Sequence, residues 1–278
     1  MEKNDFVNKF ITDINNEIWK NYDEVIKNNY KTWDYIVLTS SNKQQSEIFR
    51  KMIDYRLKNN LIPRSEYIII EDIEGKRIGS GGATLNVLKY INEKYGNLSD
   101  KKVLLINSGG DSKRVPQYSS IGKIFSPVQR ILPNGIPSTL FDENIILSTS
   151  LFYRINKGCL IMAGDVLLNF NPMQVDFFNR DIASVSISED VITGCHHGVF
   201  VTDSNKKVLK FLHKQSIENL KKYNAISSNN KVDIDTGIMF ISSTVIKDLL
   251  NILKDKKNEK IFINDNTRLN LYNDFLIP

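Results

Sequence analysis

An apolar run leads directly into a glycine-rich, cationic turn in the stretch Val103-Leu104-Leu105-Ile106-Asn107-Ser108-Gly109-Gly110-Asp111-Ser112-Lys113-Arg114-Val115-Pro116. The apolar run from Val103 to Ile106 predicts a short buried strand. Paired glycines behind such a strand leave backbone N–H groups open to an anion. Lys113, Arg114 and the nearby Lys123 can neutralise several phosphate charges. The stretch therefore predicts a strand that ends at a phosphate-binding turn.

Strand and helix patterns alternate on both sides of this stretch. Apolar and β-branched runs predict strands at 35–38, 67–70 and 159–163, and helical spacing predicts helices over 5–30, after Asn42, after residue 84 and over 145–155. That order is typical of a mostly parallel sheet flanked by helices on both faces. From about Ile182 the period changes to two, which predicts mixed strands at 182–187, 199–201, 208–212 and 236–241, and then a helix around 245–253. We expect an α/β fold in a single domain over 1–278, with an N-terminal helix in 1–30 and a nucleotide-binding half in 31–165.

A second glycine-rich segment, Gly79-Ser80-Gly81-Gly82-Ala83-Thr84, is predicted as a loop that opens a helix. It lacks the third glycine of the dinucleotide fingerprint, whose place Thr84 takes, and this argues against an NAD-linked oxidoreductase. The Gly122-Lys123 pair does not complete a P-loop, because Gln117 stands where that motif needs glycine and Ile124 follows the lysine. Either glycine segment alone is more typical of a turn. Together, each behind its own strand and with clustered cations, they favour binding of a nucleoside triphosphate.

The composition excludes several other classes of protein. Hydrophobic residues make up 41% of the chain and charged residues 25%, as in ordinary globular proteins. The net charge of +5 is mild and its lysines are interleaved with acidic residues, so no nucleic-acid partner is expected. The start of the chain has no signal-peptide pattern, no apolar run reaches about 18 residues, and only Cys159 and Cys195 are present. We expect a cytoplasmic protein with reduced thiols and no contact with a membrane.

Three long segments carry a family resemblance. Residues 77–88, 105–118 and 122–125 closely resemble the fucose-1-phosphate guanylyltransferase family, the GDP-fucose pyrophosphorylase domain that is also found fused to a fucokinase. The likeness extends from about Tyr35 to the C-terminus. It implies a GT-A-like (Rossmann-like) nucleotidyltransferase core, a Mg²⁺ cofactor, and transfer of GMP from GTP to L-fucose 1-phosphate with release of pyrophosphate. Family members commonly continue into a C-terminal β-helix, which we expect this chain, ending at Pro278, to lack.

The chemistry of that reaction agrees with the residues present. In nucleotidyl transfer the sugar phosphate is itself the nucleophile, so catalysis depends on alignment and charge neutralisation. By resemblance, Arg114 contacts the leaving β- and γ-phosphates and Lys123 lies near the α-phosphate, which makes these two the expected catalytic residues. The resemblance assigns nucleotide contacts to Gly79, Ser80, Gly81, Gly82, Thr84, Ser108, Gly109, Gly110, Asp111, Ser112 and Lys113.

The resemblance also implies metal and sugar sites. Asp165, which follows Gly164 at the carboxyl end of the strand at 159–163, corresponds to the family's metal-binding aspartate, and Mg²⁺ prefers such hard oxygen ligands. The second ligand is expected from the C-terminal part, with Asp274 as the first candidate and Asp235 as the next. The expected sugar-phosphate contacts are Lys214, Asp235, Thr236 and Gly237, within a half that spans 166–278. Gln215 replaces the proline that usually follows the lysine in this family, which loosens that turn.

Other interpretations remain beside this one. The run Cys195-His196-His197 does not indicate a zinc site, since adjacent histidines on an extended segment face opposite sides and no second pair of ligands exists. The same phosphate motifs fit a nucleotidyltransferase for another sugar 1-phosphate or another nucleotide. They also fit a non-catalytic nucleotide-sugar-binding module. The oligomeric state is left open.

Overall fold

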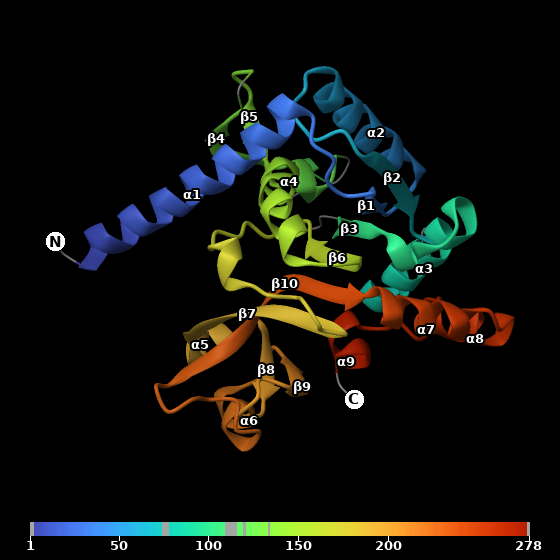
Figure 1. Cartoon of the computed structure of the whole chain (residues 1–278). Coiled ribbons are helices and arrows are strands. Elements are labelled where there is room, and N and C mark those ends of the chain that lie inside the picture. The colour runs from blue at the N-terminus through green and yellow to red at the C-terminus, as the bar shows by residue number, and fades with distance from the viewer. Residues whose placement is uncertain (1–2, 74–77, 109–115, 119–120, 133, 277–278) are drawn as a thin grey trace.

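The structure, a computed structural model, describes residues 3–73, 78–108, 116–118, 121–132 and 134–276 (Figure 1). Part of the predicted phosphate-binding turn therefore lies outside the described residues. The predictions made for Gly109, Gly110, Asp111, Ser112, Lys113 and Arg114 all fall in that part. Among the described residues, no helix is both long and apolar enough to cross a bilayer.

One large sheet organises the described chain. Its strand order is β2-β1-β3-β6-β10-β8-β9, and β7 also pairs with β10. The first four strands are mutually parallel, whereas β10 runs antiparallel to β6, β7 and β8. The bounds are β1 Tyr35–Ser40, β2 Glu66–Glu71, β3 Lys102–Asn107, β6 Gly158–Ala163, β7 Ile182–Asp190, β8 Gly198–Thr202, β9 Val208–His213 and β10 Lys231–Ser242. The predicted α/β class and its change from parallel to mixed strands are confirmed.

Helices cover both faces of the parallel strands, as predicted (Figure 1). Ile36 and Leu38 of β1 pack in a core with α1, α2 and α4, while Val37 between them packs with α3, α7 and α9. This alternation is what a strand covered on both sides requires. The helices are α1 Lys3–Asn28, α2 Lys43–Lys58, α3 Gly79–Tyr95, α4 Leu140–Leu151, α5 Val191–Gly194, α6 Ile217–Lys222, α7 Ser243–Leu253, α8 Lys256–Phe262 and α9 Leu271–Phe275. A separate hairpin joins β4 Pro127–Ile131 to β5 Pro137–Thr139.

Two predicted boundaries are wrong. The segment Gly79–Thr84 is not a loop, because α3 begins at Gly79 and includes all of it. Helix α4 begins at Leu140 rather than at residue 145. It ends at Leu151, and a 3-10 turn at Phe152–Arg154 continues almost to the predicted end at 155. A capping box sets its start: the Thr139 side chain accepts the Asp142 backbone N–H, and the Asp142 carboxylate accepts the Thr139 backbone N–H. Polar residues at a helix start escape a search for apolar periodicity.

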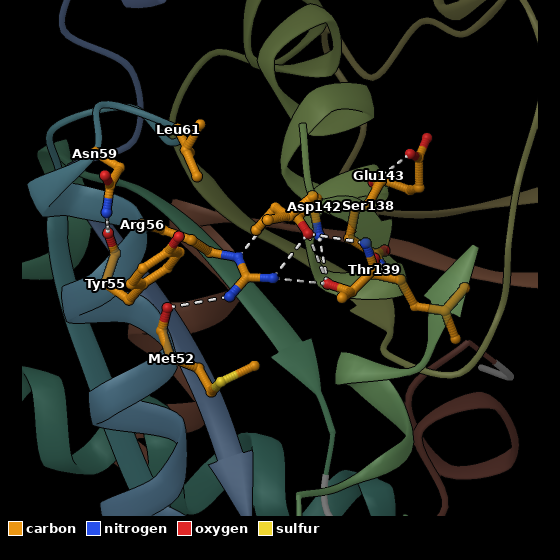
Figure 2. A network of polar contacts seen from close by, with 12 residues as sticks. Met52, Tyr55, Arg56, Asn59, Leu61, Ser138, Thr139, Asp142 and Glu143 are labelled. Carbon is orange, nitrogen blue, oxygen red and sulfur yellow. Dashed lines mark hydrogen bonds and ion pairs between the residues drawn. The ribbon is translucent and has the colours of Figure 1, made fainter. Parts of the chain in front are cut away.

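A buried ion pair connects α2 to this capping box (Figure 2). The Arg56 guanidinium donates to both carboxylate oxygens of Asp142, at 2.6 and 2.9 Å, and to the Thr139 hydroxyl at 3.2 Å. The two charged side chains are only 2% and 1% exposed. Every one of these groups is therefore satisfied by another, as burial of charge requires.

Candidate active site

The site is built at the point where the sheet changes its direction of winding. The chain passes from β1 to β2 on one side and then returns to β3 on the other side of β1. Open α/β sheets bind ligands outside the carboxyl ends of the strands at such a switch point. Ser108 lies there, with its N–H donating to Thr39 Oγ1 at 3.0 Å and its hydroxyl donating to the Thr39 carbonyl at 2.6 Å. The predicted phosphate-binding turn thus starts from a fixed anchor at this edge.

The structure brings the predicted catalytic lysine and the predicted metal-binding aspartate together. Lys123 Nζ lies 3.3 Å from Asp165 Oδ2, although 42 positions separate the two residues. Asp165 follows the end of β6, where the Gly164 N–H donates to the Asn107 carbonyl of β3 at 2.9 Å. The two side chains are 34% and 54% exposed, so their ion pair contributes little to stability and can open for a ligand. A cation and a carboxylate are therefore both available at the edge that Ser108 marks.

Aromatic packing holds the short turn that carries Lys123. This turn, Lys123–Phe125, follows Gly122, whose φ of 72° favours glycine. A Cβ at Gly122 would lie 2.9 Å from the Phe49 ring, so a larger residue has no room there. Phe125 packs at 5.2 Å between the rings of Phe49 and Phe141, and the buried Arg56 guanidinium lies 5.2 Å from the Phe125 ring centre. The position of Lys123 is thus coupled to the ion pair of Figure 2.

The predicted sugar-binding triplet forms an irregularity in β10 beside the end of β6. The pairing of β10 with β7 shifts register after Asp235, and Gly237 has a φ of 80°. A Cβ at Gly237 would lie 2.7 Å from the Ala163 Cβ, so glycine allows β10 to approach β6 closely. The Gly237 N–H donates to Asp235 Oδ1 at 2.9 Å, and the Thr236 hydroxyl donates to the Val185 carbonyl at 2.7 Å. Asp235 therefore lies at the same edge of the sheet as Asp165.

Burial changes the chemistry of Asp235. It raises the pKa of this carboxyl from 3.8 to about 6, against the opposing effect of hydrogen bonds from the Gly237 N–H and from the hydroxyl of Tyr272 in α9. Sequence reasoning missed Tyr272, because nothing in its local pattern indicates a partner in β10. Near pH 7 the Asp235 carboxylate is mostly ionised and is suited to accept hydrogen bonds from sugar hydroxyls.

Lys214 also lies at this edge, one residue beyond β9. The register places Ile234 opposite Val199 and Gly198 opposite His213, so Asp235 and His213 fall in one row across the sheet. Lys214 has a φ of 51°, and its N–H donates to the His197 carbonyl at 2.9 Å. Gln215, in the place of the family's proline, donates to the His213 carbonyl at 3.1 Å and accepts from the Asn219 amide at 2.9 Å.

Asp274 has a local role in the structure. Its carboxylate accepts the Asn270 N–H at 2.6 Å and thereby caps α9, and its exposed side chain borders an apolar cavity of about 210 Å³ lined by Leu85, Val245 and Phe262. No described contact joins Asp274 to Asp165, and no cluster of three or more potential metal-ligating side chains occurs among the described residues. The second magnesium ligand stays a prediction.

The predicted nucleotide contacts at Gly79–Thr84 have partners within the protein. The Gly81 N–H donates to the Leu269 carbonyl at 2.8 Å, and the Ser80 hydroxyl accepts the Leu271 N–H at 3.0 Å. The Thr84 side chain is buried and donates to the Ser80 carbonyl at 2.9 Å. This part of α3 is a seat for the C-terminal segment, and its role in nucleotide binding stays a prediction.

The profile of the fucose pyrophosphorylase domain matches residues 96–278. The chain is 29% identical over 255 residues to the bifunctional fucokinase/GDP-fucose pyrophosphorylase of Arabidopsis thaliana. This alignment covers 79% of this chain and 24% of that protein. It is 28% identical over 210 residues to the fucose-1-phosphate guanylyltransferase of Homo sapiens, over 70% of this chain and 34% of that protein.

The chain thus spans about a quarter to a third of the length of these relatives. Among solved structures, the crystal structure of HddC from Yersinia pseudotuberculosis aligns over 88% of this chain and 85% of its own, at 14% identity and a TM-score of 0.32.

Proposed function

This chain belongs to the fucose pyrophosphorylase domain family, and on that premise we propose that it is a sugar-1-phosphate guanylyltransferase with a GT-A-like core. The proposed reaction transfers GMP from GTP to L-fucose 1-phosphate and gives GDP-fucose and pyrophosphate. The observation that carries the proposal is the Lys123–Asp165 pair at the switch-point edge of the sheet. A guanylyl transfer needs a cation for the reacting phosphate and a carboxylate for Mg²⁺, and the pair supplies both.

In this reaction a phosphate oxygen of the sugar 1-phosphate attacks the α-phosphorus of GTP. The bond from that phosphorus to the bridging oxygen of the β-phosphate breaks, and pyrophosphate leaves with the electron pair. No nucleophile from the protein is needed. Lys123 would neutralise the charge that grows on the α-phosphate oxygens, while Arg114, as predicted from the sequence, would contact the leaving phosphates.

Asp165 suits Mg²⁺ because its half-exposed carboxylate leaves room for the waters that this ion retains. When bound, the ion would neutralise phosphate charge and orient the triphosphate. On the sugar side, Asp235 would accept hydrogen bonds from hydroxyls and Lys214 would face the sugar phosphate, across the row that joins β10 to β9. Before substrates bind, the ion pair with Asp165 would hold the Lys123 amine at the site; bound phosphates and Mg²⁺ would then take the place of this ion pair.

The decisive experiment is a screen for pyrophosphate release. Each of ATP, CTP, GTP and UTP is incubated with a panel of sugar 1-phosphates and Mg²⁺, and the nucleotide sugar is identified by mass spectrometry. We expect GTP with L-fucose 1-phosphate to be the best pair. A different best pair would keep the reaction class and correct the substrates, whereas binding of nucleotide without turnover by any pair would favour a binding module.

The change Asp165→Asn tests the proposed metal ligand. An amide oxygen is a weaker ligand for Mg²⁺ than a carboxylate, so we expect the apparent affinity for Mg²⁺ to fall about tenfold, with part of the activity recovered at high Mg²⁺. Stability should change by under about 1 kcal/mol, because the ion pair lost is half exposed. Asp54→Asn, on the exposed side of α2, is the matched control. An unchanged Mg²⁺ titration in the Asp165 variant would remove this residue from the metal site.

A further inference from the structure

A C-terminal strap, defined as residues 268–275, is clamped onto the start of α3. Two hydrogen bonds hold it there, from Gly81 to Leu269 and from Leu271 to Ser80. A Cβ at Gly81 would lie 2.9 Å from both the Leu269 Cβ and the Phe275 ring, so the strap can pack this closely only against glycine. These contacts fix the start of the strap against α3, so the strap can position the side chains that follow.

The strap brings Tyr272 against strands β8, β9 and β10. The Tyr272 ring stacks on Phe211 of β9, with centroids 4.9 Å apart and planes inclined by 19°, and lies 6.1 Å from Phe200 of β8. Its hydroxyl reaches Asp235 of β10 through a side-chain hydrogen bond. Tyr272 thus contacts the strands that carry the predicted sugar-phosphate residues, although it lies on a separate helix, α9.

We propose that Tyr272 is a positioning residue for sugar recognition, and that the strap and its glycine seat on α3 hold its hydroxyl against the Asp235 carboxylate. The Gly237 N–H occupies one carboxylate oxygen of Asp235, so a second fixed donor orients the group for a sugar hydroxyl. This inference rests on the proposed function, since it concerns the sugar 1-phosphate side of the same site.

Tyr272→Phe is the test, because phenylalanine keeps the stack on Phe211 and removes only the hydroxyl. We expect KM for the sugar 1-phosphate to rise about tenfold while KM for GTP stays within about twofold. Tyr30→Phe, at a tyrosine that is 53% exposed, is the matched control.

Binding measurements read the same contact without relying on catalysis. Calorimetric titration with the sugar 1-phosphate should give an affinity about tenfold lower for Tyr272→Phe than for the unaltered protein, and an unchanged affinity for Tyr30→Phe. Equal affinities for Tyr272→Phe and the unaltered protein would overturn the inference, whereas absence of guanylyl transfer by the unaltered protein would count only against the proposed function.

Gly81→Ala separates the strap from direct nucleotide binding at this position. The new Cβ must push the strap away, so we expect a rise in KM for the sugar 1-phosphate that resembles the effect of Tyr272→Phe. A rise confined to KM for GTP would place Gly81 in the nucleotide site and contradict its role as a seat. The Tyr272 variant keeps the inference testable if Gly81→Ala does not fold.

Discussion

Replacement of Lys123 by alanine should lower the rate of pyrophosphate release from GTP and the sugar 1-phosphate about a hundredfold or more. Electrostatic contacts to a reacting group commonly contribute ~3–4 kcal/mol in a preorganised site. Lys123 is preorganised because Gly122 and the packed Phe125 fix its turn and Asp165 holds its amine at 3.3 Å. The main effect should fall on kcat, since the charge on the α-phosphate grows in the transition state.

Two further variants sharpen this experiment. Lys123→Arg keeps the positive charge and should retain more activity than the alanine variant, while Lys51→Ala removes an exposed charge from α2 and should leave the rate unchanged. Folding of Lys123→Ala should be near normal, because a partly exposed ion pair is worth under about 1 kcal/mol. A loss of rate below about threefold, which is under 1 kcal/mol of transition-state stabilisation, would mean that Lys123 does not contact the reacting phosphate.

The second large effect is expected at the buried ion pair of Figure 2. Asp142→Ala leaves the Arg56 guanidinium, 2% exposed, without its carboxylate and also removes the capping box of α4. Removal of one partner of a buried pair typically costs about 3–5 kcal/mol, because the remaining charge is neither solvated nor neutralised. We expect a loss of this size in the free energy of unfolding, measured by urea titration.

The exposed pair between Lys27 and Asp23, at 3.6 Å, provides the control. Asp23→Ala should change the unfolding free energy by under about 1 kcal/mol, since exposed ion pairs contribute little. A double variant, Arg56→Met with Asp142→Asn, should be less destabilised than the sum of the single changes, because it leaves no unpaired charge. If Asp142→Ala cost no more than Asp23→Ala, the buried pair would not be a principal contact between α2 and α4.

The candidate site residues whose places in the fold could be predicted share one property, namely that a local pattern marks each of them. Asp165 follows the apolar strand β6 after a single glycine, so its place at a strand tip was readable from its neighbours. Lys123 follows a glycine in a region already marked by cations. Since parallel strands present their carboxyl ends at one edge, the alternation of strands and helices placed the turn after β3 and Asp165 after β6 at the same edge of the sheet.

The residues that were missed or misinterpreted depend on partners far away in the chain. The glycines at the start of α3 were read as a loop because the segment that packs on them arrives 191 positions later, in the contact between Ser80 and Leu271. Arginine is a residue type usually found at the surface, and the burial of Arg56 depends on its pairing with Asp142, 86 positions away. No local pattern in either case indicates the partner.

Local sequence patterns were enough to predict the parallel strands, the helices on both faces of the sheet and the change to mixed strands after residue 182. They also predicted the polar groups at the ends of the strands. Those features depend on periodicity and on turn-forming residues, which neighbours determine. Folding in three dimensions was needed to bring Lys123 to Asp165, to seat the strap on Gly81 and to set Tyr272 against Asp235. Such contacts arise from close packing and from burial of charge between distant segments, and both are properties of the assembled core.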